Sequence, residues 1–124
     1  MSAKVLVIDD SLLVRQQVGR TLSAGGFTII EAVDGVDAMQ KLTASPDIRL
    51  IVCDVNMPRM NGIEFLENMK RESKGAGISV VMLTTEGQTE LIQRAKSLGA
   101  RGWIVKPFKP DLLLAAAKKL TAAA

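Results

Sequence analysis

The sequence has little of several features that would point to particular classes of protein. Its one cysteine, Cys53, lies inside an apolar run, so a disulfide framework is excluded and a zinc site built from cysteines is disfavoured. The net charge is only +3, and no run of lysine and arginine is interleaved with aromatic residues, which argues against nucleic-acid binding. The amino-terminal stretch MSAKVLVIDDS has only four consecutive apolar residues, too few for a signal peptide or a membrane span. We therefore expect a cytoplasmic protein that binds neither nucleic acid nor membrane.

The length and the apolar content predict a single folded domain. A chain of 124 residues with 48% hydrophobic residues can bury one substantial core. We expect residues 1–124 to form that one domain.

Short apolar runs alternate with longer amphipathic segments. The runs typical of strands are residues 5–8, 27–32, 50–53, 78–83 and 102–105. Each is followed by apolar residues at helical spacing, as with Val14, Val18 and Leu22. Strands that are apolar on both faces and alternate with helices favour a parallel sheet covered on both sides. The sequence therefore predicts an α/β, doubly wound fold with a five-stranded parallel sheet.

Polar residues stand where these strands end. Asp9 and Asp10 follow the first strand, Asp54 the third, Thr84 the fourth and Lys106 the fifth. Right-handed crossovers bring the carboxyl ends of parallel strands to one edge of the sheet, where open α/β sheets bind their ligands. We expect three carboxylates, a hydroxyl and an ammonium group to meet there.

Three carboxylates at one edge predict a cation. Close together they repel one another, so some would take up a proton unless a cation enters. Ligands made only of oxygen select a hard cation such as Mg²⁺, which keeps several of its waters. We expect Asp10 and Asp54 to bind Mg²⁺ directly and Asp9 to bind it through water, with the backbone carbonyl of Asn56 as a further ligand.

The same residues suit phosphoryl transfer. A carboxylate can attack a phosphoryl group and form an aspartyl phosphate. The Lys106 ammonium would stabilise ionised Asp54 and hold a phosphoryl oxygen, and Thr84 would donate to a second oxygen. Asp54 is therefore the expected phosphoryl acceptor.

Each piece also has a purely structural explanation. Asp9-Asp10-Ser11 and Thr84-Thr85 are typical helix caps, Asn61-Gly62 is typical of a turn, and Lys106-Pro107 would suit a turn with a cis peptide bond. Cys53 is expected in the core. The arrival of all the polar groups at one edge is what favours a functional site.

Four motifs taken together, VLVIDDS, IVCDVNMPRMNG, VVMLTTEG and GWIVKPF, resemble the receiver domain of bacterial two-component response regulators. The resemblance spans the chain and implies a flavodoxin-like (βα)5 fold. It implies Mg²⁺-dependent transfer of a phosphoryl group from a histidine kinase to Asp54, with Asp9 and Asp10 as the acidic pair and Thr84 and Lys106 as switch hydroxyl and ammonium. Such a domain promotes only its own phosphorylation and dephosphorylation and is not otherwise an enzyme.

The resemblance also assigns roles to three neighbouring positions. Trp103 stands where the family has an aromatic residue that swings inward when the threonine moves, usually tyrosine in the chemotaxis type. The alternative for Trp103 is a partly buried strand aromatic. Asn56 and Glu86 resemble positions that modulate dephosphorylation.

The expected output is contact with another protein. We expect no output domain after these motifs, which would make the protein similar to stand-alone regulators of chemotaxis that bind the flagellar motor switch. The predicted output face comprises the fourth helix, fifth strand and fifth helix, with Gln88, Arg94, Lys96, Arg101, Lys109 and Lys118 around Trp103. This basic rim suits an acidic or amphipathic partner, and the alternative is a solvated helix face. We expect a monomer, with a weak dimer on phosphorylation through the apolar last helix.

Other interpretations remain open at this stage. Within the same class, a stand-alone receiver could serve a phosphorelay or control another enzyme. A phosphatase of the haloacid dehalogenase type would use similar chemistry, but it needs an acid/base aspartate where this chain has Asn56. A nucleotide-binding flavodoxin-like protein is disfavoured because no glycine-rich loop follows the first strand.

Overall fold

Strands and helices alternate through the computed structural model, which describes residues 3–57, 59–72, 77–84 and 89–122. The strands are β1 (Lys4–Ile8), β2 (Thr28–Ala32), β3 (Ile48–Asp54), β4 (Ser79–Thr84) and β5 (Gly102–Val105). The helices are α1 (Leu12–Ala24), α2 (Gly35–Ala44), α3 (Gly62–Arg71), α4 (Thr89–Ser97) and α5 (Pro110–Thr121). No helix in these described segments is long and apolar enough to cross a membrane.

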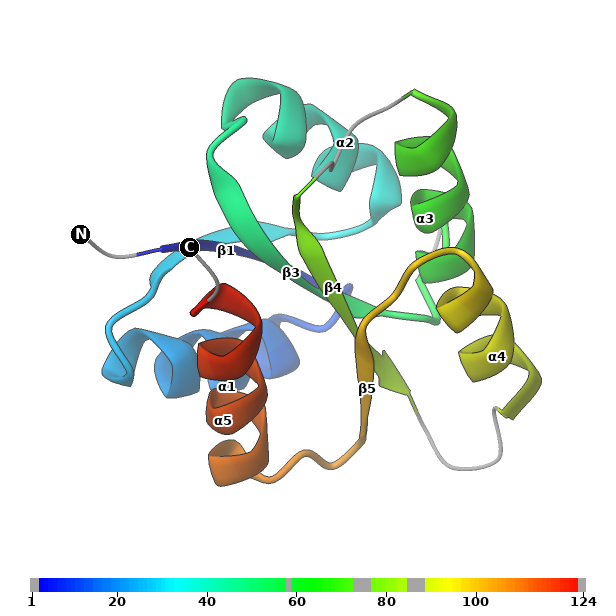
Figure 1. Cartoon of the computed structure of the whole chain (residues 1–124). Helices are drawn as coiled ribbons and strands as arrows, with labels where there is room; N and C mark the ends of the chain where they lie inside the picture. Colours follow the sequence, from blue (N-terminus) through cyan, green and yellow to red (C-terminus); the bar gives the residue numbers. More distant parts are fainter. Residues whose placement is uncertain (1–2, 58, 73–76, 85–88, 123–124) are drawn as a thin grey trace.

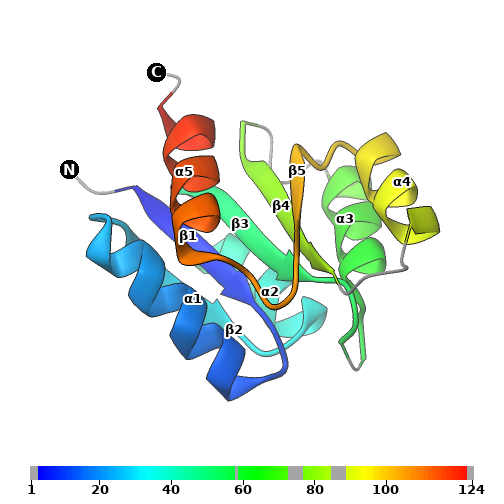
Figure 2. The same ribbon diagram turned by 90° about the horizontal axis from the view of Figure 1, so that it is seen from below.

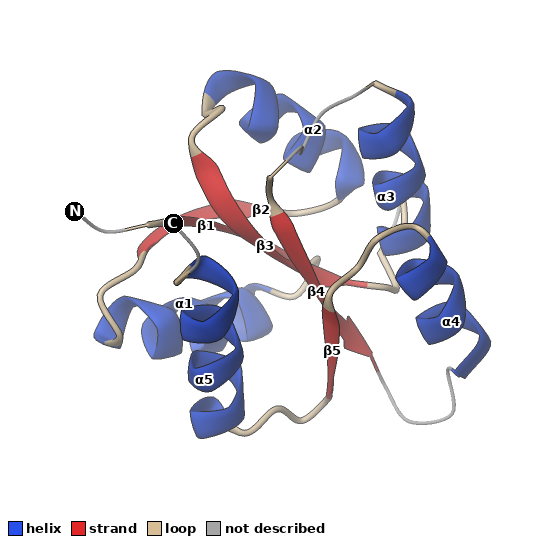
Figure 3. Ribbon diagram, in the orientation of Figure 1, coloured by secondary structure: helices blue, strands red, loops and turns tan. Residues whose placement is uncertain are grey.

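The strands form one parallel sheet in the order β2-β1-β3-β4-β5 (Figure 3). Helices cover both faces: α1 and α5 lie on one side, and α2 and α3 on the other (Figures 1 and 2). Two apolar cores follow from this layering. One packs β-strand side chains against α1 and α5, and the other packs the opposite face against α2, α3 and α4. The predicted doubly wound, flavodoxin-like α/β fold is confirmed.

The order in which successive strands are added to the sheet changes side at β1. Its neighbours are β2 on one side and β3 on the other, so crossovers leave the sheet toward opposite faces there. Ligands of open α/β sheets bind beyond the carboxyl ends of the strands at such a switch point. The fold therefore places the ends of β1 and β3 at the expected binding edge.

The edge strands differ from the central ones. Buried side chains fill almost all of β1, β3 and β4, whereas most side chains of β2 and all of those of β5 are half-buried or exposed. A strand at the edge of the sheet has only one neighbour, so solvent reaches more of it. The expectation of strands apolar on both faces thus holds only for the three in the middle.

Helix starts near the binding edge are capped by side chains. Ser11 caps the start of α1, where its hydroxyl accepts from the Val14 N–H at 3.3 Å. Asn61 caps the start of α3 in a reciprocal capping box with Glu64. The Asn61-Gly62 pair is therefore a helix start rather than only a turn.

Candidate functional site: an acidic cluster at the carboxyl edge of the sheet

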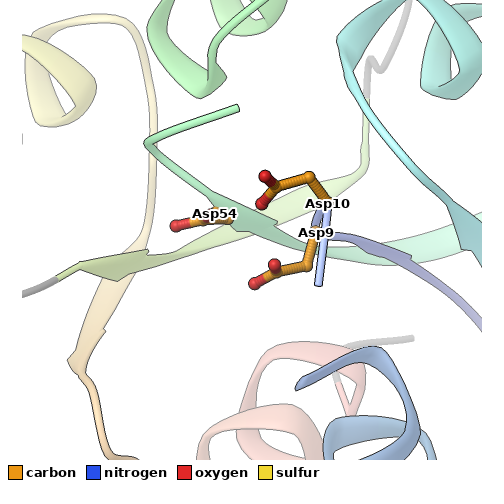
Figure 4. A group of neighbouring side chains, drawn as sticks. All are labelled: Asp9, Asp10 and Asp54. Atoms are coloured by element: carbon orange, nitrogen blue, oxygen red, sulfur yellow. The ribbon is translucent and has the colours of Figure 1, made fainter. Parts of the chain in front are cut away.

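Three carboxylates gather at the ends of β1 and β3 (Figure 4). Asp9 and Asp10 directly follow β1, and Asp54 is the last residue of β3, which pairs with β1. One oxygen from each lies within 4.8 Å of the others. Asp9 and Asp54 are buried and Asp10 is exposed. The structure thus brings together the three acids that the sequence predicted to meet.

Lys106 joins two of these acids. Its Nζ lies 3.0 Å from Asp9 Oδ2 and 3.0 Å from Asp54 Oδ1. Burial alone would lower the pKa of Lys106, but the hydrogen bonds to Asp54 and Asp9 outweigh it, so the pKa is raised. Lys106 is therefore a cation held between two carboxylates. The predicted cis peptide bond between Lys106 and Pro107 is also present.

The Asp54 carboxyl has a raised pKa because burial disfavours its charged form. The neighbouring Asp9 charge acts in the same direction. Lys106 and a hydrogen bond from the Asn56 backbone act in the opposite direction and lower this pKa. Ionised Asp54 is thus incompletely compensated, which is the situation that an added cation would relieve.

Asp9 is fixed by its neighbours. Its Oδ1 accepts from the Ser11 N–H at 2.9 Å, its Oδ2 accepts from Lys106, and its backbone carbonyl accepts from Arg15 Nη1 at 2.7 Å. Arg15 also pairs with Glu31 on β2 at 3.0 Å. The capping function considered for Asp9-Asp10-Ser11 falls to Ser11, which leaves the two aspartates facing the site. The sequence analysis missed Arg15. The feature that could have indicated it is a positively charged residue one helical turn after the Ser11 cap.

Thr84 ends β4, next to β3 in the sheet. Its side chain is buried, and its Oγ1 has no hydrogen-bond partner among the described residues. A buried hydroxyl without a partner is uncommon because its desolvation is not compensated. Such a donor at this edge suits a ligand oxygen. Thr85 and Glu86 lie outside the described residues.

The loop after β3 approaches Asp54 closely. Gly62 N–H donates to the Val55 carbonyl at 2.9 Å, and a Cβ built on Gly62 would lie 2.5 Å from the Asp54 carbonyl oxygen. Only glycine fits there without a shift of backbone. Asn56 is exposed in this loop, two residues after Asp54 in the sequence. Its backbone forms a hydrogen bond with the Asp54 carboxyl group.

Trp103 lies on the outer strand β5 and is 42% exposed. The Lys96 Nζ lies 5.3 Å from the centre of the Trp103 ring, a cation–π contact. The structure therefore has Trp103 in an outward position. Of the predicted basic rim, the members that the structure describes are all exposed: Arg94, Lys96, Arg101, Lys109 and Lys118. Gln88 lies outside the described residues.

Comparison with known proteins identifies the class. The family model described as the response regulator receiver domain matches residues 5–118. The chain belongs to the response regulator receiver domain family. This membership favours the receiver interpretation over the hydrolase and nucleotide-binding interpretations considered from the sequence.

Its relatives include chemotaxis proteins. It is 39% identical over 111 residues to the chemotaxis protein CheY1 of Helicobacter pylori, which covers 89% of this chain and 90% of that protein. It is 42% identical over 107 residues to the chemotaxis protein CheY of Treponema pallidum, covering 85% and 73% respectively. The solved structure of Vibrio cholerae chemotaxis protein CheY4 matches with a TM-score of 0.89 and 40% identity over 97% of this chain and 99% of that one. The chain is thus a receiver domain homologous to CheY chemotaxis response regulators, as the sequence predicted.

Proposed function

We propose that Asp54 accepts a phosphoryl group from the phosphohistidine of a sensor histidine kinase, with Mg²⁺, and that the phosphorylated protein signals by contact with another protein. The observation that carries the proposal is the placement of Lys106 Nζ 3.0 Å from Asp54 Oδ1, at the edge where the buried Thr84 hydroxyl has no partner among the described residues. Membership of the receiver family and homology to CheY support it.

The chemistry follows from the charges at this edge. An Asp54 carboxylate oxygen attacks phosphorus, the phosphorus–nitrogen bond of the phosphohistidine breaks, and the imidazole leaves with the bonding electron pair and takes up a proton. Lys106 holds one phosphoryl oxygen, and the Thr84 hydroxyl donates to another. Asp9 keeps Lys106 in place through its 3.0 Å ion pair. Promotion of its own phosphorylation and dephosphorylation is then the protein's only catalysis.

The donor set fits Mg²⁺. All three side chains offer carboxylate oxygens, and their arrangement within 4.8 Å suits one small hard cation. Asp10 is exposed and Asp54 is the last residue of β3, which favours these two side chains as direct ligands. The Asn56 carbonyl is the third proposed ligand. Both oxygens of Asp9 already accept hydrogen bonds, which favours its binding through water. Bound Mg²⁺ would neutralise charge on the transferring oxygens.

Thr84 and Trp103 form the proposed switch. When Thr84 donates to the phosphoryl group, Trp103 leaves its outward position and moves inward, and the face of α4, β5 and α5 changes. Asn56 and Glu86 modulate water access to the aspartyl phosphate. The function is assigned to chemotaxis, with a CheA-like histidine kinase as donor and a flagellar motor switch protein as target, in the cytoplasm. The protein acts as a monomer, with a weak dimer on phosphorylation through exposed Leu112 and its neighbours on α5.

The first experiment measures intact mass after incubation with Mg²⁺ and acetyl phosphate. We expect the gain of one phosphoryl group in the wild type and none in Asp54→Asn or in the presence of a chelator. Asp47→Asn is the matched control, since Asp47 is exposed and pairs with Lys4 at 2.8 Å. If Asp54→Asn gains the same mass as the wild type, the acceptor assignment is wrong.

A second experiment tests the target. The phosphorylated protein is passed over immobilised flagellar switch protein, with Asp54→Asn as the unphosphorylated control. Binding that depends on phosphorylation supports the motor assignment. If phosphorylation is normal but the switch protein is not bound, the motor assignment fails, and a phosphorelay or another target enzyme takes its place.

A further inference from the structure

An ion pair outside the acidic cluster joins two loops at the binding edge. Arg59, in the loop between β3 and α3, donates from Nε to Asp34 Oδ2 at 2.6 Å. Asp34 lies in the loop between β2 and α2, and its side chain is only 4% exposed, against 60% for Arg59. The Arg59 hydrogen bond is the largest cause of the lowered pKa of Asp34. The buried acid is thus tied by one cation from another loop.

The backbone at Arg59 is held in an unfavourable conformation. Its φ is 62°, the only positive value at a residue other than glycine in the described part of the chain. The left-handed region crowds a Cβ, so surrounding contacts must hold this conformation. Next to it, the Met60 carbonyl accepts from the Gly35 N–H at 3.2 Å, and a Cβ on Gly35 would meet the Met60 side chain at 2.6–2.8 Å. The two loops therefore meet at two successive positions.

The same loop carries Asn56, whose backbone bonds to Asp54. Its far end is anchored by Gly62, which donates to Val55 at 2.9 Å and leaves no space for a Cβ against the Asp54 carbonyl. Between these anchors, the described contacts that tie the loop to the β2–α2 side are those of Arg59 and Met60. Arg59 and Met60 thus join the loop that carries Asn56 to the β2–α2 side.

We propose that Asp34 and Arg59 are a positioning pair for the metal and phosphoryl site, which hold the loop so that the Asn56 backbone faces the acidic cluster. The inference rests on the proposed Mg²⁺ site, and it adds two residues that touch neither the ion nor the phosphoryl group. Partners that orient metal ligands affect metal affinity by about tenfold or more when removed. Breaking the pair therefore weakens Mg²⁺ binding by about tenfold.

Two variants break the Asp34–Arg59 pair while keeping the cap of α2 and the positive φ at residue 59. Asp34→Asn removes the charge but keeps the side-chain oxygen that accepts from the Asp37 N–H at 2.9 Å, so α2 keeps its cap. Arg59→Gly removes the guanidinium and tolerates the positive φ. Arg59→Lys keeps a cation. Asp47→Asn breaks the Lys4–Asp47 pair near the opposite ends of β1 and β3 and serves as the control.

Calorimetric titration with Mg²⁺ alone measures the dissociation constant of each folded variant, and urea unfolding without Mg²⁺ confirms folding. We expect about tenfold weaker binding for Asp34→Asn and Arg59→Gly, partial rescue by Arg59→Lys, and wild-type binding for Asp47→Asn. Phosphorylation by acetyl phosphate should need more Mg²⁺ in the two variants but reach the wild-type rate at saturation. If the wild type binds Mg²⁺ and both variants bind it within about twofold, the positioning role is wrong. If the wild type itself binds no Mg²⁺, the proposed metal site fails first, and this inference with it.

Discussion

The close approach of Gly62 to the phosphoryl acceptor makes a quantitative prediction. In Gly62→Ala the added Cβ would lie 2.5 Å from the Asp54 carbonyl oxygen, 2.8 Å from Met82 Cε and 3.0 Å from Val55 Cα. The methionine end can move, but the other two atoms are backbone of β3 and its loop. Overpacking of this kind costs about 1–3 kcal/mol. The gain in helix propensity is small because Gly62 is the first residue of α3.

We expect Gly62→Ala to lower the free energy of unfolding by about 2 kcal/mol. With a denaturant slope of about 2 kcal/mol per molar urea, the midpoint of unfolding should fall by about 1 M. Circular dichroism during urea titration measures this shift. Because the strain falls on the Asp54 carbonyl, phosphorylation by acetyl phosphate should also slow.

Two other glycines provide matched controls for the same substitution. Gly19, inside α1, has only an ordinary contact at 3.6 Å from Ile29 Cγ2, so Gly19→Ala should stabilise by about 0.5–1 kcal/mol through helix propensity. In Gly35→Ala the added Cβ meets Met60 Cγ and Sδ, which can rotate away, and Met60 Cβ at 2.8 Å, which cannot. It should therefore cost stability, but less than Gly62→Ala, whose Cβ meets two backbone atoms. If Gly62→Ala unfolds at the wild-type urea concentration while Gly19→Ala is stabilised, the backbone at Asp54 is not rigid and the reasoning fails.

Three further predictions concern side chains around the site. Thr84→Val removes a buried hydroxyl without a partner among the described residues and should raise the free energy of unfolding by about 1 kcal/mol, measured by urea titration; a loss of stability would mean that the hydroxyl is satisfied. Asp34 has a lowered pKa, caused first by its hydrogen bond from Arg59, so its ionised form contributes stability above the ordinary carboxyl pKa and loses it as the pH falls through the folded value. Asp34→Asn should therefore be less stable than the wild type at pH 7, with the difference shrinking on acidification below about pH 4, and a difference that does not depend on pH would contradict this cause. Lys96→Ala uncovers the Trp103 ring, so acrylamide should quench the tryptophan emission more strongly, and unchanged quenching would mean that the contact is not formed in solution.

The fold was largely predictable because its signals are local. Runs of apolar residues predicted all five strands, and the structure moved their limits by at most two residues, with Phe27 outside β2 and Asp54 inside β3. Glycine ended α1 as expected, where Gly26 has φ of 97°. What the pattern missed was the exposure of β2 and β5, because strand order in the sheet decides which strands lie at an edge.

The convergence of the site residues was predictable for a different reason. Asp9, Asp10, Asp54 and Thr84 stand at strand ends, which parallel topology puts at one edge of the sheet. The strand order places β1, β3 and β4 side by side, so these ends are also neighbours. The predicted Lys106–Asp54 pair is confirmed, and the structure adds that Lys106 also pairs with Asp9. The ion and the roles in phosphoryl transfer stay predictions, as does the role of Glu86.

The sequence by itself thus determined the class of fold, the family and the acidic edge, because periodicity and strand-end residues are properties of neighbouring positions. Only the tertiary structure decided which partners those residues meet. In the folded protein Arg15 donates to the Asp9 carbonyl, Arg59 donates to Asp34, and Lys96 lies over the Trp103 ring. The Thr84 hydroxyl has no hydrogen-bond partner among the described residues. Such pairs join residues from different elements, and long side chains find them only when packing sets the distance and direction between those elements, which no local pattern records.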